Sequence, residues 1–298
     1  MTYSIVARDA MTGALGVAVQ SHYFSAGSVV PWAEAGIGAV ATQAMGEPAY
    51  GALGLELMRG GKSAREALRA LVAGDAGEAT RQVAMIDARG GVAAHTGARC
   101  IAQAGHRTGE GVSAQANMME RDTVPDAMLA AYASTSGDLA ERMLAALDAA
   151  EAEGGDIRGR QSAAILVVSG DPAGRPWWAT REMELRVEDH ADPLSELRRL
   201  VALKRAYRAS DDGFEQMLQG DVPGGLAAME QAHAAAPENA ELAFWYALAL
   251  ARTQPERARA LLAEVRRGEP RWGELLRRLP AAGLFPDDRA LIERLLAD

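Results

Sequence analysis

The stretch Met1-Thr2-Tyr3-Ser4-Ile5-Val6-Ala7-Arg8-Asp9 decides how this chain is interpreted, because it has the pattern of a strand from its second residue onward. A second strand-like run covers residues 14–20, after a short turn-like segment that ends in Gly13. The two runs predict a β-hairpin. Because hairpin register fixes cross-strand partners, Thr2 is expected opposite residues 20–22.

Thr2 becomes the first residue if the initiator methionine is removed, and a second residue as small as threonine normally permits that removal. A free α-amine beside a threonine hydroxyl is a complete nucleophile–base pair, because the amine can accept the hydroxyl proton during attack on a carbonyl. The alternative is that Thr2 is only the first residue of a strand. Retention of Met1 would block the amine and favour that alternative.

Length and composition restrict the classes of protein that fit. The 298 residues suffice for one large domain and a smaller one, or for two ordinary domains. The net charge of −9 argues against nucleic acid or an anionic membrane as the main partner. The single cysteine, Cys100, excludes an internal disulfide framework and fits a reducing compartment.

No apolar run approaches the length of a transmembrane helix, and the first residues lack the pattern of a signal peptide. We therefore expect a soluble, cytoplasmic protein. The five histidines are scattered without metal-ligand spacing, so neither a metal nor a cofactor is expected.

The remaining elements of the first 190 residues alternate between strand-like and helix-like groups. Helices are predicted at 50–59, 63–74, 124–133 and 139–153, and further strands at 37–43, 81–87, 91–95, 111–117, 161–168 and 183–187. Ser63 and Glu66 stand in capping-box register at the start of the second helix. Many strand segments are apolar on both faces, which predicts an α+β fold with sheets packed between helix pairs.

From Pro193 onward the strand signal disappears and Ala, Leu, Arg and Glu dominate. The sequence predicts two domains, 1–190 and an all-α domain at 193–298. Helical hairpins that restart near Pro237 and Pro270 look like a short tetratricopeptide-type array. An ordinary helical cap on the first domain explains the same pattern.

Four separated motifs carry a resemblance to a known family: Leu15-Gly-Val-Ala-Val-Gln-Ser21, Gly27-Ser-Val-Val-Pro-Trp-Ala33, Gly38-Ala-Val-Ala-Thr-Gln-Ala44 and Gly155-Asp-Ile-Arg-Gly-Arg-Gln-Ser-Ala-Ala164. They resemble the bacterial domain of unknown function 1028, a family of the N-terminal nucleophile hydrolase superfamily. The resemblance covers about residues 1–190. It implies a four-layer αββα sandwich and an amide hydrolase.

Two amide side chains are candidates for an oxyanion hole, because an amide donates a neutral hydrogen bond to developing charge. Gln43 ends the third predicted strand; its alternative role is to satisfy backbone groups at a strand end. Asn117 lies at a strand–helix junction where proteasome-like relatives place a small polar residue. Its alternative role is a helix N-cap.

The other candidates follow from the hairpin register and from the resemblance. Ser21 and His22 should lie beside Thr2 and contact substrate, although His22 would equally serve as a strand cap. Asp156 matches the aspartate that supports the threonine in proteasome-like relatives. Arg158 and Arg160 are candidates for an anionic substrate group, or for ion pairs that hold the loop.

Two departures from the proteasome-like pattern concern charge. Gln20 stands where the second strand of those enzymes ends in an acid, and no lysine precedes Lys62. The charge relay of those enzymes is then either absent here or built differently, from His22 and Arg158.

Two hypotheses follow from these residues. The first is an N-terminal threonine amidohydrolase acting on a small amide or peptide-like substrate. The second is a non-catalytic binding or scaffold protein whose helical tail recognises a partner peptide. Either is compatible with a homo-oligomer.

Overall fold

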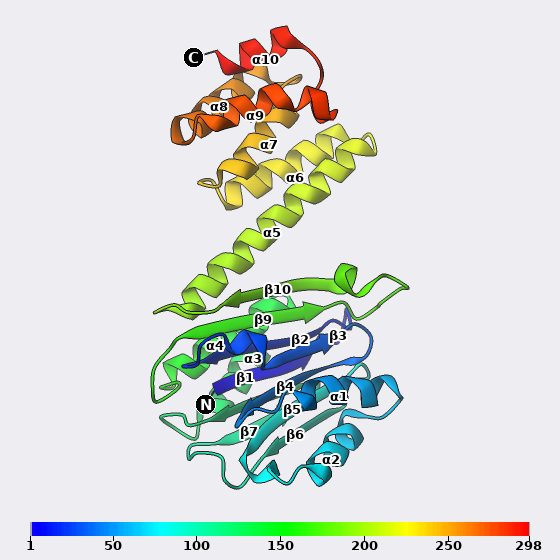
Figure 1. The fold of residues 1–298 in the computed structure, drawn as a ribbon, viewed down its shortest axis with the longest axis vertical. Helices are drawn as coiled ribbons and strands as arrows, with labels where there is room; N and C mark the ends of the chain where they lie inside the picture. The colour runs from blue at the N-terminus through cyan, green and yellow to red at the C-terminus, as the bar shows by residue number, and fades with distance from the viewer. Residues whose placement is uncertain (1, 298) are drawn as a thin grey trace. The chain divides into compact units, whose positions relative to one another are not determined.

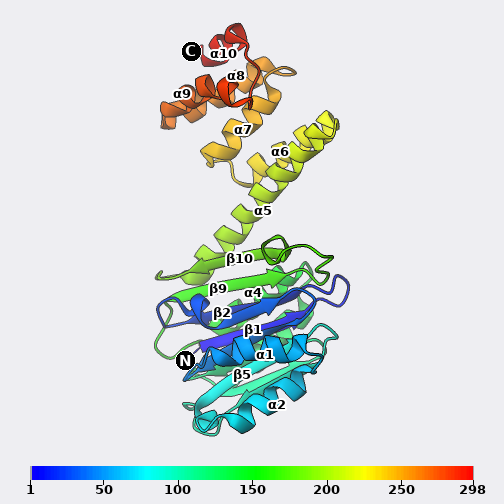
Figure 2. The same cartoon turned by 45° about the vertical axis from the view of Figure 1, so that its right-hand side comes forward.

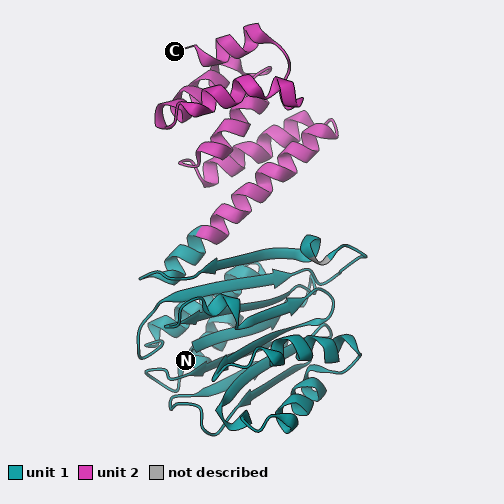
Figure 3. Ribbon diagram, in the orientation of Figure 1, with its two compact units in different colours: residues 1–199 teal, residues 200–298 magenta. Residues whose placement is uncertain are grey.

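The computed structural model describes residues 2–297, and the chain divides into two compact units, residues 1–199 and 200–298 (Figure 3). Helix α5 (Pro193–Leu218) contains the division point. The boundary expected from the sequence, between residues 190 and 193, lies just before this helix.

The first unit contains two antiparallel sheets (Figure 1). The six-stranded sheet has the order β10-β9-β2-β1-β8-β7, and the four-stranded sheet has the order β3-β4-β5-β6. Their bounds are β1 Thr2–Arg8, β2 Leu15–Ser21, β3 Pro31–Glu34, β4 Gly38–Ala44, β5 Arg81–Asp87, β6 Val92–Thr96, β7 Gly105–Gly109, β8 Val112–Asn117, β9 Ser162–Val168 and β10 Arg181–Val187.

Each sheet carries a helix pair on its outer face, as the two views of Figures 1 and 2 show. Helices α1 (Ala49–Arg59) and α2 (Ala64–Gly74) pack on the four-stranded sheet, and α3 (Val124–Ser134) and α4 (Leu139–Ala152) pack on the six-stranded one. A buried apolar cluster fills the space between the sheets and includes Val6, Val17 and Ile86. The mixed α+β class expected from the sequence is confirmed.

The hairpin of β1 and β2 has the predicted register, with Thr2 opposite Ser21. The predicted capping box of α2 is also present: the Ser63 hydroxyl accepts from the Glu66 N–H, and the Glu66 carboxylate accepts from the Ser63 N–H. Local sequence signals therefore determine these two elements.

Two short strands were not predicted. Strand β3 begins at Pro31, and β7 runs between Gly105 and Gly109 with three polar residues between them. Both lie at the edge of a sheet, where neither the alternating nor the continuous apolar pattern is required.

The second unit is helical, as expected. After α5 it contains α6 Val222–Ala235, α7 Ala240–Leu250, α8 Pro255–Gly268, α9 Arg271–Arg278 and α10 Arg289–Leu296. Its own buried core is centred on Phe244, Leu250 and Leu262. Within residues 2–297, no helix combines the length and apolar character needed to cross a membrane.

Candidate functional site

Thr2 begins β1, the strand that lies between β2 and β8, and it is paired on both sides. Its cross-strand partners are Ser21 of β2 and Asn117 of β8, and Ser162 of β9 lies opposite Ser21. Cross-strand partners share a face of the sheet, so these four polar residues form one row. Thr2 is only 4% exposed, and its hydroxyl donates to Ser21 Oγ at 3.0 Å.

The space between the sheets changes from apolar to polar toward this end. Along β1 the inward positions run from Val6 through Ser4 to Thr2. Inward positions on β4 and β5 change in the same way, ending at Gln43 and Gln82. The polar groups so buried are uncharged hydroxyls and amides, which require hydrogen bonds at close range.

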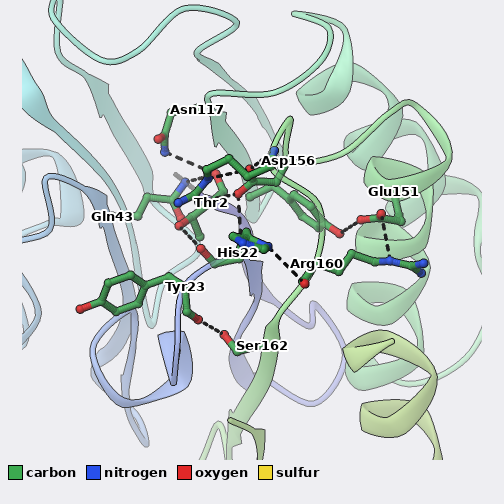
Figure 4. A network of polar contacts seen from close by, with 12 residues as sticks. Thr2, His22, Tyr23, Gln43, Asn117, Glu151, Asp156, Arg160 and Ser162 are labelled. Atoms are coloured by element: carbon green, nitrogen blue, oxygen red, sulfur yellow. Dashed lines mark hydrogen bonds and ion pairs between the residues drawn. The ribbon is translucent and has the colours of Figure 1, made fainter. Parts of the chain in front are cut away.

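Hydrogen bonds to several neighbours fix the amide of Gln43 in one orientation, and Figure 4 shows how it lies beside Thr2. Its Oε1 accepts from the Ser4 hydroxyl at 2.6 Å, and that hydroxyl oxygen accepts from Gln115 Nε2 at 2.7 Å. Its Nε2 donates to the Thr2 carbonyl at 3.2 Å and to Gln82 Oε1 at 2.8 Å. The reversed amide would place its oxygen against these acceptors, so only this orientation satisfies the cluster.

Asn117 holds the same carbonyl from the neighbouring strand. Its Nδ2 donates to the Thr2 carbonyl at 3.4 Å and to Gln82 Oε1 at 2.8 Å. Its Oδ1 is buried without a hydrogen-bond partner. The alternative role as an N-cap is wrong, because α3 begins only at Val124.

Gln82 joins the two amides and was missed by the sequence reasoning. Its Oε1 accepts from both Gln43 and Asn117, and its Nε2 donates to the Ala116 carbonyl at 2.8 Å and to Thr96 Oγ1 at 3.0 Å. Gln82 is the second residue of β5 and directly precedes its apolar run, and the only available signal was a polar residue at the start of a buried run.

The geometry assigns Gln43 and Asn117 to positioning. An amide nitrogen carries two hydrogens, and those of both residues already donate to the Thr2 carbonyl and to Gln82. They therefore hold the Thr2 peptide in place and have no N–H directed at a substrate in this arrangement.

The polar cluster continues toward the surface through Thr96 and His106. Gln82 Nε2 donates to Thr96 Oγ1, which lies 2.9 Å from His106 Nδ1. Burial, with the nearby charge of Arg107 and His95, lowers the pKa of His106. His106 lines an open groove of about 550 Å³ together with Cys100, Gln103, Arg107 and Asp122.

Asp156 and Arg158 form an ion pair beside the end of β2. The fully buried Asp156 carboxylate accepts from Arg158 Nη2 at 2.8 Å and Nε at 3.1 Å, and from the His22 backbone N–H at 3.3 Å. The His22 ring nitrogen Nδ1 lies 3.3 Å from the Arg160 carbonyl. Asp156 thus connects the loop of residues 153–161 to the residue that follows Ser21.

The Arg160 guanidinium is not brought to Thr2. It pairs with Glu151 at 3.5 Å and with Asp192 at 3.2 Å. Glu151 also accepts from the Tyr3 hydroxyl at 2.6 Å, and Tyr3, as the next residue of β1, lies on the opposite face of the strand from Thr2. Burial and this carboxylate raise the pKa of Tyr3.

Backbone strain also concentrates at the Thr2 end. Among the described residues, the non-glycine residues with positive φ are Ser25, Ala44, Gln103, Met118 and Ala173. Ala44 is the last residue of β4, and Ser25, Gln103 and Met118 lie in the segments that follow β2, β6 and β8 at this end of the sheets. Such conformations cost about 1–3 kcal/mol each and cluster at functional sites. No group of three or more His, Cys, Asp or Glu residues in the part of the chain that the structure describes is arranged to hold a metal ion.

The fold and the site define an α+β protein with two antiparallel sheets and a buried polar cluster around the first residue of β1. Residues 2–197 match the family of unknown function DUF1028, and the chain belongs to that family. Among solved structures, it is similar to the crystal structure of protein SPO2555 from Silicibacter pomeroyi, described as family-model DUF1028. The two are 32% identical over 67% of this chain and 87% of that chain, with a TM-score of 0.60. No curated protein matches.

Proposed function

We propose that the chain is an N-terminal threonine amidohydrolase of the N-terminal nucleophile superfamily. The observation that carries the proposal is the position of Thr2: it begins a strand paired on both sides, its hydroxyl faces Ser21, and two buried amides hold its carbonyl. The order helix pair, sheet, sheet, helix pair supports assignment to the αββα sandwich of that superfamily.

The proposed reaction begins once residue 1 has been removed and the Thr2 amine is free. The amine accepts the hydroxyl proton as Oγ1 attacks the amide carbonyl, and a tetrahedral intermediate forms. The proton passes to the leaving nitrogen, the C–N bond breaks, and an ester to Thr2 remains. Water then attacks the ester with the amine again as base, which releases the acid and restores Thr2.

The surrounding residues have supporting roles in this proposal. Gln43 and Asn117 fix the Thr2 peptide so that hydroxyl and amine keep one geometry, and Gln82 fixes both amides. Ser21 orients the nucleophilic hydroxyl. The Asp156–Arg158 ion pair sets the electrostatic environment next to Ser21. Its carboxylate is held there because it accepts a hydrogen bond from the His22 N–H.

The test is the intact mass of untagged protein, before and after reaction with a β-lactone, which acylates an activated threonine hydroxyl. We expect a mass without Met1 and one lactone added at Thr2. Thr2→Ser should keep the labelling, because it keeps a hydroxyl and an amine. Thr2→Ala should slow it by at least about 1000-fold, since the nucleophile is gone. Retained Met1 with no adduct would contradict the proposal.

A binding or scaffold protein is the second candidate, and one observation favours it: the amide hydrogens at the site are already used within the protein. In this case the second unit would supply partner recognition through helix pairs of the tetratricopeptide type, such as α6 with α7. Its expected signature is a retained Met1 and equal, slow labelling of wild type and Thr2→Ala.

A further inference from the structure

Large apolar side chains lie exposed in the segments at the Thr2 end of the sheets. We call the following set the apolar rim: Tyr23, Phe24, Met45, Ile101 and Ile157, each between 49% and 65% exposed. Tyr23 and Phe24 follow β2, Met45 follows β4, and Ile101 and Ile157 lie in the loops 97–104 and 153–161. These are the segments that border the polar cluster.

Backbone hydrogen bonds tie these segments to the strand ends. Met118, the residue after Asn117, donates its N–H to the Ile101 carbonyl and accepts at its own carbonyl from the Ile157 N–H, both at 3.2 Å. The Ser162 hydroxyl donates to the Tyr23 carbonyl at 2.7 Å. Ser162 belongs to the same cross-strand row as Thr2. The segments that carry Ile101, Ile157 and Tyr23 are therefore hydrogen-bonded to the strand ends that form the candidate site.

The two arginines of the loop 153–161 are already paired with carboxylates. Arg158 is paired with Asp156, and Arg160 with Glu151 and Asp192. A substrate carboxylate would have to compete with these carboxylates for the guanidinium groups. A grouped set of exposed apolar side chains, in contrast, gains from being covered, because exposed apolar clusters mark binding sites.

From these observations we infer that the substrate carries a large apolar group close to its amide, and that the apolar rim selects it. The inference rests on the proposed function, since it assigns a specificity to the same site. The small anionic amide considered from the sequence is the competing substrate class.

The experiment compares two β-lactones that differ only in their ring substituent, benzyl or carboxymethyl. In each reaction Thr2 Oγ1 attacks the lactone carbonyl, the ring C–O bond breaks, and the hydroxyl proton ends on the released alkoxide through the amine. The adduct mass equals protein plus lactone. We expect the benzyl lactone to react at least about tenfold faster, in line with the discrimination that apolar contacts provide.

Two rim variants, Phe24→Ser and Ile157→Ser, test which residues carry the preference. Both side chains are exposed, so the changes spare the core. The control is Met11→Ser, a still more exposed apolar residue in the turn at the opposite end of the β1–β2 hairpin. Each rim variant should lower the benzyl-to-carboxymethyl ratio by at least about threefold, and the control should leave it unchanged.

The other outcomes distinguish a failure of the apolar specificity from a failure of the proposed hydrolase activity. Labelling of Thr2 at equal rates by both lactones, or faster by the carboxymethyl lactone, overturns the apolar specificity and leaves the hydrolase intact. Absence of any Thr2 adduct overturns both. If the rim variants keep the ratio but convert a wild-type dimer to a monomer in light scattering, the rim is an interface between copies and the inference fails.

Discussion

Gln20 of β2 has a fully buried side chain, and neither its amide nitrogen nor its amide oxygen has a hydrogen-bond partner. It lies opposite Tyr3 and Ala163, on the face away from Thr2. A buried amide left unpaired costs about 1–3 kcal/mol. Gln20 is therefore a site of local instability one residue from Ser21.

The Gln20→Met variant should be more stable than wild type, by about 1 kcal/mol, because methionine has a similar shape and no polar group to leave unpaired. The urea midpoint, followed by far-UV circular dichroism, measures the change. The matched control is Gln43→Met, whose wild-type amide is fully paired, and that variant should be less stable. A lower midpoint for Gln20→Met would show that its amide makes a favourable interaction.

At the residue scale the sequence predicted positions along strands but not contacts between sheets. The placement of Ser21 beside Thr2 followed from hairpin register, which is local. The contact of Gln43 with Gln82 joins adjacent strands β4 and β5, and the contact of Asn117 with Gln82 joins different sheets. Hydrophobic periodicity does not reveal such contacts, so the role of Gln82 in joining the two amides could not be predicted from the sequence of its own strand.

At the scale of elements, one hydrogen bond links α1 to the segment that follows α2. The buried Tyr50 of α1 donates its hydroxyl to Asp75 Oδ2 at 3.1 Å, and Arg81 pairs with the same carboxylate oxygen at 2.9 Å. Burial and the hydrogen bond to Asp75 raise the pKa of Tyr50 to about 12 from 10.0. The neutral phenol is therefore the form that stabilises this junction.

This shift predicts a dependence of stability on alkaline pH. A pKa raised in the folded state contributes stability that is complete below the unfolded value, near pH 10, and is lost as pH rises toward 12. Wild type should therefore lose more stability than Tyr50→Phe between pH 10 and 12, as measured by urea midpoints at each pH. Parallel loss in both proteins would mean that Tyr50 titrates normally.

Elements were predictable where their signal is local and their position is buried. The capping box of α2 and the apolar run of β9 are examples. The strands β3 and β7 were missed because their formation depends on the neighbour that they pair with, β4 and β8. Their own residues, which include Pro31 and the polar run after Gly105, carry little strand preference.

At the scale of the whole molecule, each unit has a buried core made of its own residues. The core of the second unit contains the fully buried Phe244, whose ring lies 4.9 Å from that of Trp272. The core between the sheets of the first unit draws only on residues between Val6 and Val168. Damage to one core is therefore expected to stay within its unit.

The Phe244→Ala variant should destabilise the second unit by about 3–5 kcal/mol, the usual cost of removing a buried aromatic ring. Hydrogen exchange with mass spectrometry should show lost protection in α7, α8 and α9, with β1 and β2 unchanged. The control is Phe214→Ala, an exposed residue of α5. Equal loss of protection in β1 and β2 would show that the units unfold together.

The double pairing of Thr2 has a practical consequence for anyone producing this protein. Because β1 is hydrogen-bonded to both neighbours from its first described residue, an affinity tag fused ahead of Thr2 would extend from a strand that is already held in place. Such a preparation would fold, melt and elute normally, but the Thr2 nitrogen would be part of a peptide bond and not a free amine. Under the proposed mechanism, activity screens on such tagged material would detect no hydrolysis by a correctly folded protein, so the tag belongs at the other terminus.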